Sequence, residues 1–182
     1  MILSDREIQR LLKNRLITIE PTPTLDAYDS TAVDLTLDSH IRVFRTNVPG
    51  FVIDPSAAGY KATALILSAT DLFTIPQQGW ELQRGTLVLG WTRERIDLDY
   101  KAKVAGRVEG KSGLARIGLA VHVTAPTIHA GFPGTIQLEL INHGPAPIKL
   151  CPGMPICQLI IEAVKGTPSK AHKSQFADQR AR

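Results

Sequence analysis

Residues 110–116 carry side chains that suit the binding of phosphate. The run reads Gly-Lys-Ser-Gly-Leu-Ala-Arg, so two glycines permit close backbone approach and Ser112 supplies a hydroxyl. Arg116 can bind phosphate oxygens through a fork of donors, and Lys111 adds a point charge. The run predicts a binding site for the phosphates of a nucleotide. A polar turn with solvated charges is the alternative.

The triplet at residues 110–112 is not part of a Walker A loop. That motif needs a glycine five positions before its Gly-Lys pair, and this position is Ala105. Residues 103–109 alternate as a strand does, and no long helix is predicted after them. We therefore exclude a P-loop nucleoside triphosphatase.

Glu139 lies in a segment that follows a glycine-rich loop. Apolar and polar side chains alternate over residues 135–140, so Gln137 and Glu139 share one face of a strand. Pattern alone makes Glu139 a solvent-facing strand residue. Two features instead favour a binding site. Glu139 follows loop 122–134, and the side-chain amide of Gln137 can pair with the edge of a base.

Cysteine spacing argues against zinc. Cys151 and Cys157 are the two cysteines of the chain, and they form neither a C-x-x-C pair nor a cluster with histidine. The H-x-E and P-C-x-x-C signatures of zinc deaminases are also missing. Around the cysteines, residues 150–159 read as a Pro-Gly turn that enters a strand.

The elements that would position these residues are mostly strands. Ser4 and Glu7 form a capping-box pattern, which predicts a short helix that ends near Asn14. After residue 31 the apolar residues recur at every second position, as in strands. Besides the first helix, a single helical turn is expected at residues 112–117. The clearest alternating segments are residues 32–37, 41–44, 86–92, 135–140 and 156–161. This pattern predicts a mainly β fold, a barrel or a sandwich.

Composition narrows the class of protein. The 182 residues are 43% apolar, which fits one domain with an ordinary core. The net charge of +4 favours anionic partners, but only 5% of the residues are aromatic, so a base-stacking nucleic-acid surface is disfavoured. The first residues contain no long apolar run. We expect a cytoplasmic protein that binds neither nucleic acid nor membrane.

Six segments in this order resemble the deoxycytidine triphosphate (dCTP) deaminase family, relatives of the trimeric dUTPases. They are Leu3–Ile8, Ala32–Leu37, Glu109–Gly118, Val121–Ala125, Gly131–Asn142 and Pro152–Leu159. The likeness spans nearly the whole chain. Several spaced motifs in register are more specific than any one of them, and they favour the site over each structural alternative.

The resemblance implies a distorted dUTPase-like β-barrel with a short N-terminal helix. It implies one domain over residues 1–165 and a flexible tail over residues 166–182 that closes over bound nucleotide. It further implies a homotrimer with active sites between subunits. The reaction would be hydrolysis of dCTP to dUTP and ammonia without zinc or another protein-bound metal, with Mg²⁺ carried by the triphosphate.

The resemblance also assigns roles. Glu139 corresponds to the catalytic glutamate, which takes a proton from water and delivers protons to the ring and the departing amine. The backbone of Thr124 and Ala125 is expected to hold the water, and Gln137 the pyrimidine. The remaining expected contacts to nucleotide are Lys111, Ser112, Gly113, Arg116, His129, Gln158 and Gln179.

Departures from the family pattern fall within the expected site. His129 stands where many relatives have an aspartate that contacts the sugar, and Gly113 stands where a second serine is usual. In the tail, Gln175 replaces a lysine and Phe176 a common tyrosine. Two alternatives therefore stay open: a bifunctional deaminase and dUTPase that yields dUMP and pyrophosphate, and a non-catalytic nucleotide-binding regulator. Residues 121–123 look more like the monofunctional pattern.

Overall fold

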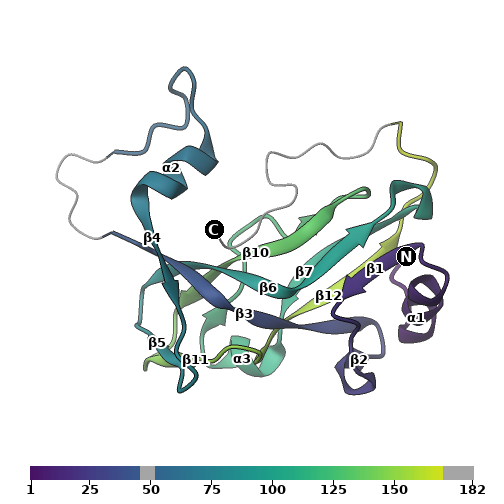
Figure 1. The fold of residues 1–182 in the computed structure, drawn as a ribbon, viewed down its shortest axis with the longest axis horizontal. Coiled ribbons are helices and arrows are strands. Elements are labelled where there is room, and N and C mark those ends of the chain that lie inside the picture. Colours follow the sequence, from purple (N-terminus) through teal and green to yellow (C-terminus); the bar gives the residue numbers. More distant parts are fainter. Residues whose placement is uncertain (46–51, 170–182) are drawn as a thin grey trace.

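The chain folds mainly into strands (Figure 1), and the computed structural model describes residues 1–45 and 52–169. The helical elements of this part are α1 (Asp5–Lys13), α2 (Ala62–Ala69), α3 (Ser112–Arg116) and two 3-10 turns, η1 (Leu25–Ala27) and η2 (Tyr100–Ala102). The long strands are β3 (Ala32–Phe44), β6 (Leu87–Leu98), β7 (Val104–Gly110), β10 (Pro133–Asn142) and β12 (Pro155–Ala163). The short strands are β1 (Ile17–Glu20), β2 (Tyr28–Asp29), β4 (Thr70–Thr74), β5 (Trp80–Leu82), β8 (Leu119–Ala120), β9 (Thr127–Ile128) and β11 (Ile148–Leu150).

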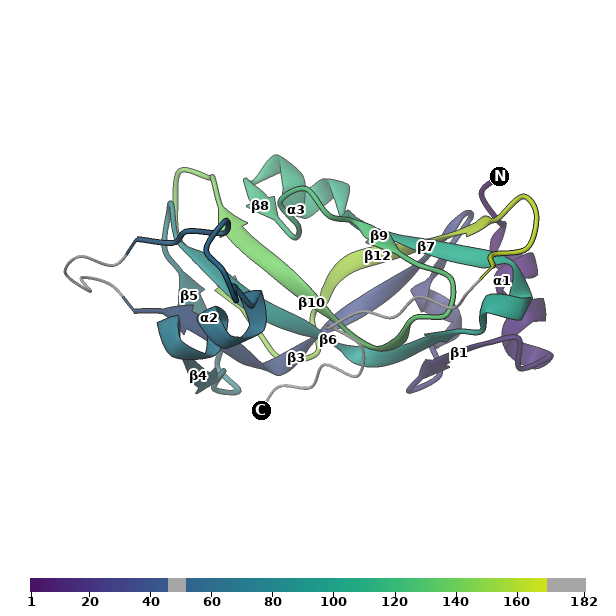
Figure 2. The ribbon, with the colours of Figure 1, turned by 90° about the horizontal axis from the view of Figure 1, so that it is seen from above.

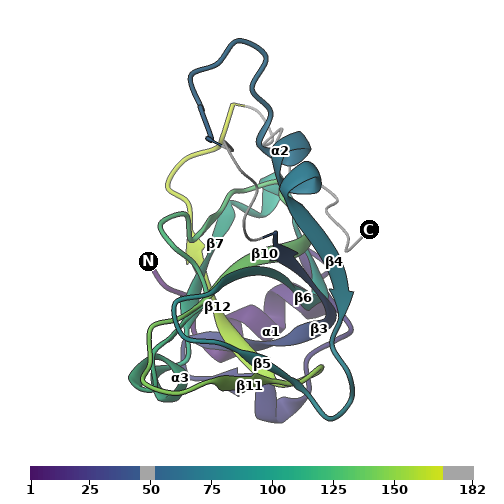
Figure 3. The ribbon, with the colours of Figure 1, turned by 90° about the vertical axis from the view of Figure 1, so that its left-hand side faces the viewer.

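Ten strands form one sheet, which curls around the core as an incomplete barrel (Figure 3). Its central order is β8-β10-β6-β3-β12-β7-β9, while β1 pairs with β6, and β2 and β4 pair with β3. Strands β5 and β11 make a separate two-stranded sheet. Figure 2 shows α1 near one end of the molecule and α2 near the other. The prediction of a mainly β, barrel-like fold with a short N-terminal helix is confirmed.

Alternation along the strands builds the core. Every second residue of β10 from Gly134 to Asn142 is buried, and the side chains between them lie on the more open face. The largest fully buried side chains are isoleucines and leucines drawn from strands across the sheet, such as Leu37, Ile96 and Leu138. Because each buried aliphatic side chain contributes about 1.5–3 kcal/mol, this common core fixes the strand faces. The polar face of β10 is then available for a site.

Helix α1 begins as its sequence predicts. Ser4 Oγ accepts a hydrogen bond of 3.4 Å from the amide of Glu7, and the helix ends at Lys13 with Asn14 as its C-cap. The second half of the predicted capping box differs, because the Glu7 carboxylate accepts hydrogen bonds from Arg10 at 2.8 and 3.0 Å. Ile8 and Leu11 are the buried residues of the helix. They anchor it to the core.

A bulge in β6 sets the position of β10. Thr135 faces Arg95 and Gln137 faces Trp91, so two steps along β10 match four along β6. Thr92, which is fully buried, fills this break: its Oγ1 donates to the carbonyl of Glu94 at 2.8 Å and accepts from the amide of Ile136 at 3.0 Å. Satisfied buried polar groups make such a break stable.

Two features differ from the sequence-based expectation. Residues 32–37 and 41–44, predicted as separate strands, form the continuous strand β3, with an irregularity against β6 between Leu37 and Ile41. Helix α2 was not predicted, because its segment Ala-Thr-Ala-Leu-Ile-Leu-Ser-Ala has apolar residues on all sides and no polar stripe. No helix in the described ranges is long and apolar enough to cross a membrane.

Candidate active site

A cavity of about 520 Å³ opens beside β10 and the loop that precedes it. Fifteen residues line it: Phe44, Ile66, Leu89, Val108, His122, Ala125, Thr127, Ile128, His129, Phe132, Thr135, Ile136, Gln137, Leu138 and Glu139. Its walls are mostly apolar, and a few polar groups converge on it. Sites for small organic ligands have this size and character.

Glu139 and Gln137 reach the cavity from alternate positions of β10. In the strand register Glu139 is opposite Leu89 and Gln137 is opposite Trp91, both on β6. A carboxylate and a carboxamide therefore lie about two strand residues apart on one wall, a spacing of roughly 7 Å along the backbone. This distance suits two contacts to one ring and its substituent.

The loop before β10 closes over Glu139. The amide of Val123 donates a hydrogen bond of 3.3 Å to Glu139 Oε2, so the loop and the strand are directly linked. Ala125 and His129 line the cavity, and their contacts to nucleotide stay predictions. Thr124 is exposed and is not among the lining residues. Its expected contact to a catalytic water stays a prediction.

His122 also lines the cavity and was not named as a site residue from the sequence. Its Nε2 lies 3.8 Å from Glu109 Oε2, while its buried Nδ1 has no hydrogen-bond partner. Arg107 Nε lies 3.2 Å from Glu109 Oε1, which is close enough for an ion pair, although its N–H makes no hydrogen bond. The Glu109 carboxylate of β7 thus lies beside the imidazole of His122. No local sequence pattern links the two residues.

The predicted phosphate loop follows β7 directly. Gly110 ends the strand and α3 begins at Ser112, which confirms the single helical turn. Ser112, Gly113 and Arg116 are exposed, and no atom lies within 4 Å of the place where a Cβ on Gly113 would stand. The loop is therefore open to a ligand.

Two of the predicted nucleotide contacts meet at one carboxylate. Lys111 Nζ forms a short ion pair with Asp34 Oδ2, and Gln158 Nε2 donates to Asp34 Oδ1 at 3.2 Å. Asp34 lies on β3 and Gln158 on β12, where the two face each other in the strand register. Asp34 lies within the matching segment Ala32–Leu37, but the sequence predicts no role for it.

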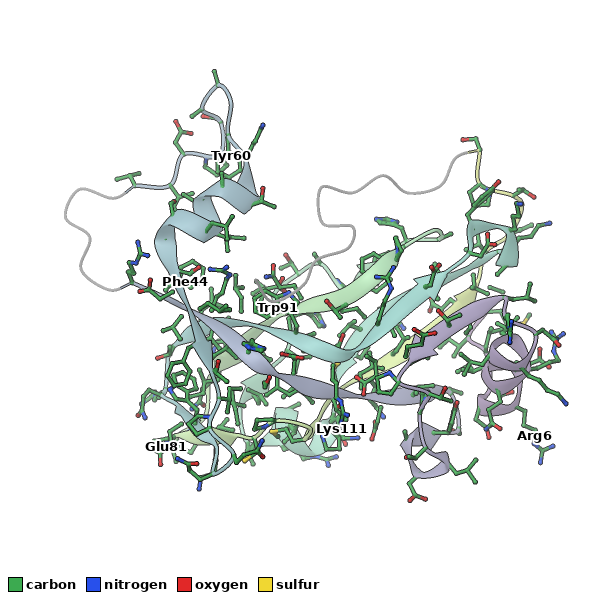
Figure 4. All side chains as sticks on the ribbon, viewed as in Figure 1. Arg6, Phe44, Tyr60, Glu81, Trp91 and Lys111 are labelled. Carbon is green, nitrogen blue, oxygen red and sulfur yellow. The ribbon has the colours of Figure 1, made fainter. Side chains whose placement is uncertain are left out.

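The predicted residues form two groups in the chain. Gln137, Glu139, Ala125 and His129 share the cavity, whereas none of Lys111, Ser112, Gly113, Arg116 and Gln158 lines it. Figure 4 shows Lys111 below Trp91 and apart from it; Trp91 is the cross-strand neighbour of Gln137. Gln179 and the departures at Gln175 and Phe176 lie outside the described residues.

Sequence comparison decides the family. A family described as dCTP deaminase-like matches residues 2–164. The chain belongs to this family. Among its relatives, the dCTP deaminase of Rhodospirillum rubrum is 38% identical, and the match covers 100% of this chain and 94% of the relative. The dCTP deaminase of Shewanella sp. (strain W3-18-1) is 36% identical over 96% of this chain and 90% of its own. The resemblance inferred from the six segments is confirmed.

Solved structures agree on the fold of this dCTP deaminase-like chain. The 2'-deoxycytidine 5'-triphosphate deaminase from Agrobacterium tumefaciens has a TM-score of 0.68 at 21% identity, covering 89% of this chain and 48% of that one. A dUTPase from phage phi11 of S. aureus has a TM-score of 0.52 at 9% identity, covering 87% and 96%. These likenesses place the incomplete barrel in the dUTPase-like fold.

Proposed function

We propose that the protein is a cytoplasmic homotrimeric enzyme that hydrolyses dCTP to dUTP and ammonia. One observation carries the proposal: Glu139 and Gln137 face one apolar cavity in a chain of the dCTP deaminase-like family. The names of the relatives in Rhodospirillum and Shewanella support an enzymatic role and this substrate. The cavity volume of about 520 Å³ leaves room for a pyrimidine and its sugar.

The proposed chemistry uses Glu139 as the only acid and base. Its carboxylate takes a proton from a water molecule, the water oxygen bonds to carbon 4 of the cytosine, and the proton passes to ring nitrogen 3. The remaining hydroxyl proton then passes through Glu139 to the amino group, which leaves as ammonia and restores the carbonyl. The Val123 amide, 3.3 Å from Oε2, supports this role because it holds the carboxylate in one orientation.

Recognition of the base and sugar is assigned to the rest of the cavity. Gln137 offers two amide N–H donors, which complement the carbonyl oxygen and ring nitrogen 3 of cytosine, both of which are acceptors. His129, where relatives carry an aspartate, is proposed to contact the sugar hydroxyl through a ring nitrogen. The backbone of Thr124 and Ala125 is proposed to hold the attacking water.

Phosphate recognition is assigned to Lys111, Ser112, Gly113, Arg116 and Gln158. Mg²⁺ would enter with the triphosphate as part of the substrate, and the segment 166–182, including Gln179, would close over it. Among the described residues, no three histidine, cysteine or acidic side chains lie close enough together to hold a metal ion. That the deamination step uses no protein-bound metal is proposed from the family resemblance.

The separation of the two groups supports a site shared between subunits. In one chain the phosphate residues do not line the cavity that holds Glu139, so a complete site would combine the cavity of one copy with residues 111–116 of another. Exposed apolar side chains give a second argument, since Leu67, Leu72 and Phe73 of the α2–β4 region are each more than a third exposed. Covering them would stabilise an assembly.

The variant Glu139→Gln tests the assignment of the acid and base. Because an amide cannot shuttle protons, we expect kcat for dCTP to fall by about a thousandfold or more while dCTP still binds. Ammonia release and calorimetric binding of dCTP measure the two effects. Glu81→Gln is the matched control, since Glu81 is an exposed strand carboxylate outside the cavity, and its kcat should equal that of the wild type. A Glu139→Gln protein with wild-type turnover would contradict the mechanism.

A further inference from the structure

Asp34 contacts two of the proposed phosphate-binding side chains, Lys111 and Gln158. It lies on β3 between the fully buried Val33 and Leu35, so its side chain projects from the opposite, open face of the strand. Strand β12 runs beside β3 with Gln158 directly across from Asp34, and β7 lies on the other side of β12. Lys111 follows β7, and its Nζ contacts the carboxylate.

Both oxygens of Asp34 are engaged. Oδ2 pairs with the Lys111 ammonium, and Oδ1 accepts the Gln158 amide at 3.2 Å. The side chains of Asp34 and Lys111 are 20% and 28% exposed, so the pair is partly buried but still reaches solvent. A lysine ammonium has three donor hydrogens and a glutamine side chain keeps a second donor and an acceptor. Each partner therefore still has hydrogen-bonding groups for a ligand.

Holding the Lys111 and Gln158 side chains in place before binding should increase the affinity for a ligand. Lysine and glutamine lose much rotamer freedom when a ligand orders them, and a protein that has already ordered them binds more tightly. We propose that Asp34 is a positioning residue that holds Lys111 and Gln158 in place for the phosphates of the nucleotide. The inference rests on the proposed function, because that function supplies the phosphates.

Equilibrium binding to dCTP and to deoxycytidine tests the proposal, because the two ligands differ only in the phosphates. We expect Asp34→Ala to weaken dCTP binding about tenfold and to leave deoxycytidine binding unchanged. Asp34→Asn keeps an acceptor for Gln158 but removes the charge opposite Lys111, so its loss should be intermediate. In steady-state assays the same variants should raise KM for dCTP and leave kcat unchanged.

Glu162→Gln is the matched control. Glu162 lies on the same strand and face as Gln158 and forms an ion pair of 3.5 Å with Arg107, but it contacts neither Lys111 nor Asp34 in the described structure. This variant should bind both ligands as the wild type does. Urea unfolding of all three variants detects any general loss of the fold.

Three results would overturn the positioning role. The first is tighter dCTP binding by Asp34→Ala, which would mean that Asp34 competes with phosphate for Lys111. The second is an equal loss of affinity for dCTP and for deoxycytidine. The third is wild-type affinity in both Asp34 variants. A wild-type protein that binds dCTP without releasing ammonia would contradict the proposed function and leave the Asp34 comparison valid. A wild-type protein that does not bind dCTP would contradict both.

Discussion

Cys157 and Cys151 lie close in sequence but in different surroundings. Cys157 sits on β12 between Leu35 of β3 and Gly110 of β7, with no exposed surface. Burial, with smaller contributions from Glu94 and Asp34, raises the pKa of its thiol far above the usual range. Cys151 is only partly buried. Since the thiolate is the reactive form, the two residues should behave differently.

This contrast predicts the outcome of thiol labelling. At about pH 8 a disulfide reagent should modify Cys151 in the folded protein and reach Cys157 only after unfolding, because Cys157 stays protonated and covered. Mass spectrometry of the labelled peptides measures each site. Cys151→Ser should abolish the reaction of the folded protein. Fast labelling of both thiols without denaturant would show that β12 is not packed as described.

At the scale of the elements, the turn between α3 and β8 packs closely against the turn that follows β10. Gly118 has a φ of +95°, and its carbonyl accepts a hydrogen bond of 2.8 Å from the amide of His143. A Cβ on Gly118 would stand 2.2 Å from the nitrogen of Gly144. Asn142, at the end of β10, binds the same Gly144 nitrogen through Oδ1 at 2.8 Å. This contact ties α3 to the strand that carries Glu139.

Gly118→Ala should therefore destabilise the protein more than Gly85→Ala, a substitution that also places alanine at a positive φ. Gly85 also has a positive φ, +72°, but nothing lies within 4 Å of its would-be Cβ, so Gly85→Ala reports the backbone cost alone. We expect Gly118→Ala to lose at least about 2 kcal/mol more free energy of unfolding than Gly85→Ala in urea. Equal losses would mean that the α3 and β10 turns are not in contact.

The sequence predicts the elements better than the contacts between them. Alternation predicted the strand that carries Glu139, and the glycine-rich run predicted the turn at α3, because both signals are local. The Asp34–Gln158 contact joins residues 124 positions apart and depends on the register of β12, which no local pattern encodes. Helix α2 was missed because its apolar residues lack a helical stripe, so nothing local revealed Ile66 as part of the cavity wall.

At the scale of the whole molecule, the distribution of site residues is the central fact. The cavity with Glu139 and the loop with Arg116 lie in separate places on one chain. If each site combines the cavity of one subunit with the loop of its neighbour, a mixed assembly of two inactive variants can contain active sites. One chain would supply an intact Glu139 and its neighbour an intact Arg116.

Subunit complementation tests this arrangement. Glu139→Gln and Arg116→Ala are each expected to be nearly inactive, and their random co-assembly should restore about one quarter of wild-type activity, since one site in four receives both intact residues. Ammonia release from the co-expressed mixture gives the yield, and light scattering gives the mass. A mixture as inactive as its parents would place all site residues in one subunit.

The most direct measurement of the proposed function is product analysis of the purified wild-type protein. Incubated with dCTP and Mg²⁺, it should release one ammonia for each dUTP formed, without pyrophosphate, while dCMP, CTP and dUTP are compared as substrates. Pyrophosphate and dUMP beside ammonia would instead indicate a bifunctional enzyme. Absence of any uracil nucleotide would contradict the proposal that Glu139 and its cavity deaminate dCTP.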